Sequence, residues 1–186
     1  MISQSRVLFY CSLLLIPSAA FAEDAPQFPG TAPEHELLKR FVGAWTSTSE
    51  CTIAPGADPM KSSGKMVSRM LGERWVVSEM TVGEGVAAVE GILTIGYDPA
   101  EQKYVGTWTD NMQNRLWVYE GSYDEEKRTL MLDTTGPNIT GEGEIIPYQD
   151  SYEFVSDDEI VMRSKAKGED GEWVTFMTSQ MRRASE

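Results

Sequence analysis

Few residues in this chain could carry out chemistry, and histidine is the scarcest of them. His35 is the only histidine. One histidine excludes a histidine-rich zinc site and an H-E-x-x-H motif, and it leaves a Ser-His-Asp triad only if His35 itself serves. His35 lies among charged residues in a segment expected to be helical. We therefore expect it to face solvent or to cover one end of the domain.

Carboxylates are the other candidates, because the chain holds 29 acidic residues. Glu79, Asp110 and Glu120 each fall within a predicted strand, beside apolar or aromatic residues. Two buried carboxyl groups at a suitable separation could act as general acid and base, although most acidic residues belong to solvated faces. Asp110 follows Trp108 by one pleat, and a buried carboxylate beside an indole is either paired or has a raised pKa. Its possible basic partners are Arg74, Arg115 and Arg163.

The charge and the cysteines limit the classes of partner. A formal net charge of −13 argues against nucleic acid, which requires clustered Lys and Arg, and it disfavours anionic lipid. The chain holds two cysteines, of which Cys11 lies in the N-terminal apolar run. Cys51 would then be alone in the domain, without an internal disulfide. We interpret Cys51 as a buried small apolar residue, and we predict no metal and no cofactor.

Residues 1–22 have the pattern of a secretory signal peptide. Arg6 precedes an apolar run, and Ala20-Phe21-Ala22 fits the A-x-A cleavage pattern. The apolar run is too short to anchor the chain, so no membrane insertion is expected after cleavage. The sequence therefore predicts an exported protein, periplasmic or extracellular. Residues 23–33, rich in Pro and small residues, are predicted to be a flexible tether.

Residues 34–184 are predicted to form a single all-β domain that begins with a short N-terminal helix. Leu37, Leu38 and Phe41 form one apolar face of that helix, and Gly43 ends it. Short β-rich segments then alternate with turn residues. The predicted strands lie near 44–52, 62–70, 73–82, 88–97, 103–111, 115–123, 128–134, 147–155, 159–167 and 172–183. About ten strands joined by hairpin-length loops favour an antiparallel up-and-down β-barrel, with a β-sandwich as the alternative.

The alternation within the strands indicates which side chains point inward. In the segment 159–167 one face is that of the core, with Ile160, Met162, Ser164 and Ala166. Trp108 and Asp110 share a face, and Trp117 shares one with Tyr119 in the next strand. Apolar side chains occur on both faces here. This pattern is typical either of a barrel packed inside and covered outside, or of a cavity lined with aromatic and polar groups.

Several segments together resemble a bacterial family known as domain of unknown function 1579. These segments are Pro33–Leu38, Phe41–Trp45, Gly72–Glu79, Gly96–Asp98, Lys103–Met112 and Met181–Arg183. The resemblance covers nearly all of the domain. It implies a barrel similar to the calycins, the group that contains lipocalins and fatty-acid-binding proteins. The family carries no established activity, so the resemblance bears on the fold more than on the function.

The resemblance also implies roles for three residues at one barrel end. Gly43-Ala44-Trp45 is similar to the G-x-W of the first lipocalin strand, where the Trp closes the barrel and an Arg of the last strand packs over it. Arg182 is the matching arginine, and Arg183 is the second candidate. Heme-binding calycins ligate iron through a histidine in a barrel strand. No predicted strand contains one, which argues against heme.

Three functions stay open, and we predict the first. It is a barrel that binds a small apolar or amphipathic molecule, whose polar end meets Asp110 and an arginine. The candidate ligand-binding residues are Trp75, Glu79, Trp108, Asp110, Met112, Trp117 and Tyr119. The second is a packed structural or protein-interaction module with an exposed apolar patch. The third is a hydrolase or isomerase that uses carboxylates such as Asp110 and Glu79. The sequence leaves open whether the protein is an enzyme and which oligomeric state it has.

Overall fold

The computed structural model describes residues 30–52, 56–138 and 143–185. The predicted signal peptide, residues 1–22, lies outside them and stays a prediction. From Thr31 onward the chain forms one compact unit. No helix in the described part of the chain is long and apolar enough to cross a membrane.

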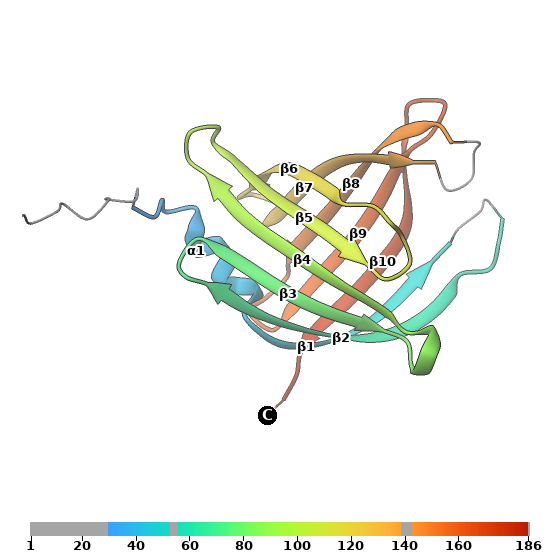
Figure 1. Ribbon diagram of the computed structural model, residues 1–186, viewed down its shortest axis with the longest axis horizontal. Helices are drawn as coiled ribbons and strands as arrows, with labels where there is room; N and C mark the ends of the chain where they lie inside the picture. The colour runs from blue at the N-terminus through green and yellow to red at the C-terminus, as the bar shows by residue number, and fades with distance from the viewer. Residues whose placement is uncertain (1–29, 53–55, 139–142, 186) are drawn as a thin grey trace, which may run out of the picture. The chain divides into compact units, whose positions relative to one another are not determined.

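Ten antiparallel strands form one closed barrel (Figure 1). Strands adjacent in sequence pair with each other, and β1 also pairs with β10, which closes the sheet. The strands are β1 Gly43–Cys51, β2 Met60–Leu71, β3 Trp75–Val82, β4 Val89–Asp98, β5 Lys103–Asp110, β6 Trp117–Asp124, β7 Thr129–Pro137, β8 Ile145–Phe154, β9 Glu159–Lys167 and β10 Trp173–Arg183. The predicted up-and-down barrel is confirmed, and the β-sandwich alternative is wrong.

The strands β7 and β8 are longer than the sequence predicted. The prediction ended the first near residue 134 and began the second near residue 147. In the structure, pairing continues to Pro137 opposite Ile145. Proline is tolerated here because Pro137 ends its strand and Pro147 lies close to the start of the next, where a missing N–H group costs few ladder bonds.

A short helical segment covers one end of the barrel (Figure 1). It consists of α1 (His35–Leu38) and η1 (Lys39–Phe41), and a second 3-10 turn, η2 (Gly85–Ala87), joins β3 to β4 at the other end. Leu38 and Phe41 are fully buried. The indole of Trp45 donates a hydrogen bond to the carbonyl of Phe41 over 2.8 Å. The apolar face predicted for the helix is therefore the lid of this barrel end.

Arg183, rather than Arg182, packs over Trp45. Its guanidinium carbon lies 4.4 Å from the Trp45 ring centroid, and Nη1 donates to the carbonyl of Val42 over 2.7 Å. Arg182 points outward and pairs with Glu159 over 3.1 Å. Arg183 takes this position because successive side chains of a strand point to opposite faces, and Arg183 is the residue in register with Trp45.

Gly43 contributes to the same closure through its missing side chain. Its φ is +120°, and a Cβ atom there would lie 2.6 Å from Nη1 of Arg183. A residue with a side chain would suffer both backbone strain and a clash with the guanidinium.

His35 belongs to the covered barrel end and does not face solvent. It is 3% exposed, and its ring packs edge-on against Tyr97 with centroids 5.9 Å apart. The amide of Ala32 donates to Nδ1 over 2.9 Å. The expectation of a covering role is met, and the alternative of a solvent-facing side chain is wrong.

Candidate functional site

The barrel interior is filled near the helix and partly open towards the other end. Towards the helical end most inward side chains are buried, among them Trp45, Val76, Ile95, Leu130, Phe154 and Ile160, while Met70, Tyr97 and Tyr123 at the rim are partly buried. Farther along the same strands, inward side chains keep partial solvent exposure, including those of Met80, Trp108, Trp117, Met162 and Met177. Solvent therefore reaches the inward-facing side chains of the end opposite the helix, and we call this part of the interior the cup.

Aromatic side chains form one wall of this cup. Trp108 and Trp117 stand opposite each other in register on β5 and β6. The ring of Trp117 meets that of Tyr148 edge-on at 5.4 Å, and Tyr148 meets Phe176 at 6.1 Å. These contacts form an aromatic arc, Trp108, Trp117, Tyr148 and Phe176, near the open end. Such walls bind apolar and aromatic molecules.

Two glycines make room for the indoles of the arc. A Cβ atom on Gly91 would lie 2.1 Å from the Trp108 ring, and one on Gly136 would lie 2.1 Å from the Trp117 ring. The six-membered ring of each indole therefore packs directly against a glycine of a neighbouring strand, where no side chain could be accommodated.

Below the arc lies a buried polar cluster centred on Asp150. Tyr119 Oη donates to Asp150 Oδ2 over 2.7 Å, and Ser164 Oγ donates to Oδ1 over 2.6 Å. Tyr119 and Ser164 are each 4% exposed. The three residues come from β6, β8 and β9, and Leu132 of β7 lies between them in the sheet.

The carboxyl group of Asp150 is surrounded by protein atoms, although the residue as a whole keeps partial solvent exposure. Burial raises the pKa of its carboxyl group, while the hydrogen bonds from Ser164 and Tyr119 act in the opposite direction. Burial, followed by the nearby Asp150 charge, also raises the pKa of Tyr119, so its phenol stays a proton donor. Asp150 therefore lies where the buried part of the interior meets the part that solvent reaches.

Asp110 has a structural task that the sequence did not specify. Its Oδ2 accepts a hydrogen bond from the Trp108 indole over 2.9 Å. Its Oδ1 accepts the amides of Met112 and Gln113 over 2.8 and 2.9 Å. Asp110 therefore starts the loop after β5 and fixes the orientation of Trp108, as a paired carboxylate. No arginine is among these partners.

Two of the three candidate arginines contact other groups, and the third lies at the other barrel end. Arg163 pairs with Glu153 on the outer face over 2.8 Å. Arg115 lies at the mouth, 5.1 Å from the Trp117 ring centroid, and donates to the carbonyl of Thr135 over 2.8 Å. Arg74 lies in the β2–β3 turn, at the helical end.

Three predicted ligand-binding residues do not point into the cup. Trp75 and Glu79 lie on the outer face of β3, whose inward positions are those of Val76, Ser78 and Met80. Met112 lies in the loop after β5 and is 65% exposed. Glu79 and Asp110 therefore lie on opposite faces of the barrel wall and cannot converge on one substrate. The strands of this region are apolar on both faces, so alternation alone could not assign the inside.

Asp150, Ser164 and Tyr148 are the site residues that sequence reasoning missed. Tyr148, Asp150 and Tyr152 alternate along β8, and all three share the inner face. That tyrosine-aspartate-tyrosine alternation was the available signal.

Cys51 lies at the inner edge of the mouth, half-buried, and burial raises the pKa of its thiol.

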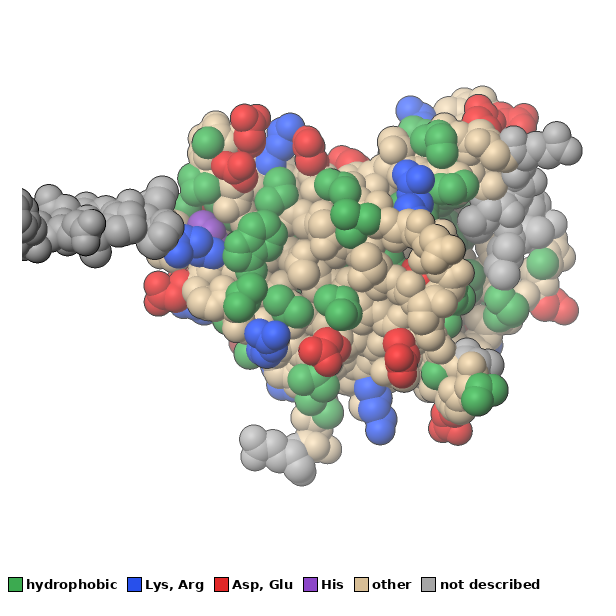
Figure 2. Space-filling view, in the orientation of Figure 1, with side chains coloured by type: hydrophobic (Ala, Val, Ile, Leu, Met, Phe, Trp, Pro, Cys, Tyr) green, Lys and Arg blue, Asp and Glu red, His purple; other side chains and the backbone are tan. Residues whose placement is uncertain are grey.

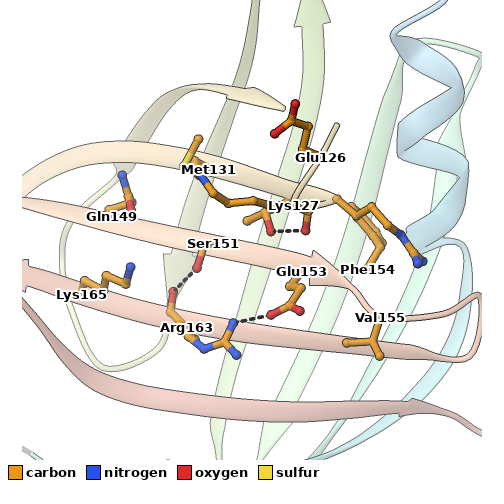
Figure 3. A pocket seen from close by; sticks show the side chains of 12 residues that line it. Glu126, Lys127, Met131, Gln149, Ser151, Glu153, Phe154, Val155, Arg163 and Lys165 are labelled. Carbon is orange, nitrogen blue, oxygen red and sulfur yellow. Dashed lines mark hydrogen bonds and ion pairs between the residues drawn. The ribbon is translucent and has the colours of Figure 1, made fainter. Parts of the chain in front are cut away.

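A groove of about 770 Å³ on the outer surface offers a competing location (Figure 3). It runs over the outer faces of β7, β8 and β9. Its central charged groups, Arg163 and Glu153, neutralise each other across 2.8 Å. The groove is open to solvent and Phe154 is the one aromatic residue among those that line it, so we favour the cup. Among the described residues, no three His, Cys, Asp or Glu side chains gather as a metal site requires.

Comparison with known proteins places this barrel among solved folds. The structure of Rv2717c from M. tuberculosis matches with a TM-score of 0.57 and 13% identity, over 84% of this chain and 100% of that one. The S-type phycobiliprotein lyase CPES from Guillardia theta matches with a TM-score of 0.56 and 14% identity, over 82% and 93%. At these identities the likeness concerns the fold. No curated protein sequence matches.

The family comparison covers almost the whole described unit. The model for the family "Protein of unknown function (DUF1579)" matches residues 30–183. The match contains the covering helix, all ten strands and the aromatic arc. The chain therefore belongs to the DUF1579 family.

Proposed function

We propose that this protein is an exported barrel that binds a small apolar or amphipathic molecule in the open half of its interior. The observation that carries the proposal is the partial exposure of inward-facing aromatic and methionine side chains, above a floor of fully buried ones. Methionine adapts its shape to varied apolar partners, and aromatic walls bury large apolar surfaces. Export rests on the sequence of residues 1–22.

The packed-module alternative has one observation in its favour. Apolar side chains spread over the outer face of β2, β3 and β4 (Figure 2), and this region includes Leu71 of β2, Trp75 of β3 at 38% exposure and Ile92 of β4. That alternative also requires a filled interior. Since the inward side chains near the mouth stay partly exposed, the interior agrees better with a binding barrel.

The carboxylate-enzyme alternative lacks its second carboxylate. Asp110 is occupied by an indole and two amides, and Glu79 lies on the outer face. Asp150 is the remaining interior acid. A single carboxyl group held by two hydroxyl groups suits binding better than paired acid–base catalysis.

Native mass spectrometry of the full chain, purified from its own host, tests the proposal. We expect a discrete excess mass over the denatured protein, and we expect bound apolar probes to change tryptophan fluorescence through Trp108 and Trp117. A bare mass together with unchanged fluorescence for every probe would contradict the proposal.

A matched pair of variants locates the binding. Met80→Trp places an indole in the cup, whereas Thr81→Trp places one on the outer face of the same strand. We expect Met80→Trp to raise the dissociation constant of an apolar probe at least tenfold, corresponding to about 1.4 kcal/mol, and Thr81→Trp to leave it unchanged. Circular dichroism checks that both variants fold.

A further inference from the structure

Resting on the proposed function, we infer that the ligand of this barrel is an organic cation: a protonated amine or quaternary ammonium group on an apolar body, with its positive charge at Asp150. The charged end of the ligand would meet the carboxylate of Asp150, and not that of Asp110 as the sequence suggested.

The first argument is the sign of the charges inside the barrel. The inward-facing charged side chains of the described strands are Asp110, Asp150 and Arg183. Arg183 lies at the covered end, over Trp45. The open half therefore contains acidic groups and no basic one along its strands. A cationic ligand would supply the charge that this half lacks.

The second argument is the unused capacity of the Asp150 carboxylate. A carboxylate offers about four acceptor positions, and the hydroxyl groups of Tyr119 and Ser164 occupy two of them. In the described part of the chain, no Lys, Arg or His nitrogen forms an ion pair with Asp150. A buried ionised carboxylate without a counter-charge is costly, and an ammonium group beside it would remove that cost.

The third argument is the position of the aromatic arc. Tyr148 and Trp117 stand one pleat from Asp150 and Tyr119 on the same inward faces of β8 and β6. Aromatic faces attract cations, and protein sites for quaternary ammonium groups are built from such faces. The arc and the carboxylate thus form adjoining parts of one recognition site.

The fourth argument is the charge at the mouth. The described loops of the open end carry Asp58, Glu84, Glu144, Glu169, Asp170 and Glu172. Arg115 is the single basic residue there, and its guanidinium is held against Trp117 and the Thr135 carbonyl. An acidic rim raises the local concentration of cations and repels anions.

Three probes with the same apolar tail test the inference: decyltrimethylammonium, decanol and decanoate, titrated into the full chain below their aggregation limits. Tryptophan fluorescence and calorimetry report the affinities. We expect the ammonium probe to bind at least about tenfold more tightly than decanol, and decanoate to bind most weakly. We expect Asp150→Asn to remove this preference.

Asp133→Asn is the matched control, because it changes the net charge equally but lies on the outer face of β7, where Asp133 accepts a hydrogen bond from Gln149. It should keep the preference for the ammonium probe. Equal affinities for the ammonium probe and decanol, or a preference that survives Asp150→Asn, would overturn the inference and leave the binding barrel intact. Failure of all three probes to bind would instead count against the proposed function. Thermal melting of both variants verifies folding.

Discussion

At the scale of single residues, Asp150 is the most informative group in the barrel. Burial raises the pKa of its carboxyl group in the folded state. Its proton is therefore held more tightly after folding, and the stability that it contributes is lost as the pH rises from the unfolded value of 3.8 through the folded pKa. The groups that face Asp150 are the phenols of Tyr119 and Tyr152 and the hydroxyl group of Ser164.

The raised pKa of Asp150 predicts that, without ligand, the effect of Asp150→Asn on the free energy of unfolding depends on pH. The free energy of unfolding of the variant, relative to wild type, should rise with pH above 3.8 and level off above the folded pKa. The rise should be about 1.4 kcal/mol for each unit by which the pKa is raised. Urea denaturation at several pH values measures it. A difference that is constant with pH would show that the carboxyl group does not titrate abnormally.

At the scale of elements, the barrel wall depends on pairs of one large and one small residue. Trp117 of β6 lies over Gly136 of β7, and Trp108 of β5 lies over Gly91 of β4. We predict that Gly136→Ala displaces the Trp117 ring into the cup, which lowers stability by about 1–3 kcal/mol and weakens ligand binding. Thermal melting and probe titration measure the two effects. Gly30→Ala, whose Cβ would meet no atom within 4 Å, should change neither.

At the scale of the whole molecule, the two barrel ends have different tasks. The helical end is closed by Trp45 and Arg183, and the open end carries the aromatic arc. We predict that Arg183→Met lowers the free energy of unfolding by about 1–3 kcal/mol, since it removes hydrogen bonds to the carbonyls of Val42 and Asp157 and the contact with Trp45. Ligand affinity should be unchanged, because the arginine is remote from the cup.

Arg182→Met is the control for that prediction. Arg182 is exposed and makes a surface ion pair with Glu159, so its loss should cost about 0–1 kcal/mol. Chemical denaturation of both variants gives the comparison. An equal loss of stability in the two variants would contradict the assigned role of Arg183.

The sequence by itself determined the architecture, because turn residues and a two-residue period are local signals. They predicted ten strands and the covering helix, and they placed Trp108 with Asp110 on one strand face and Trp117 with Tyr119 on another. Which face of a strand points inward is decided by pairing around the whole barrel, so Trp75 and Glu79 fell on the outside. The same pairing brought Asp150 to Ser164 of the next strand and to Tyr119, which lies two strands earlier in the chain. Only the closed sheet could decide that the interior acid is Asp150 and that the arginine over Trp45 is Arg183.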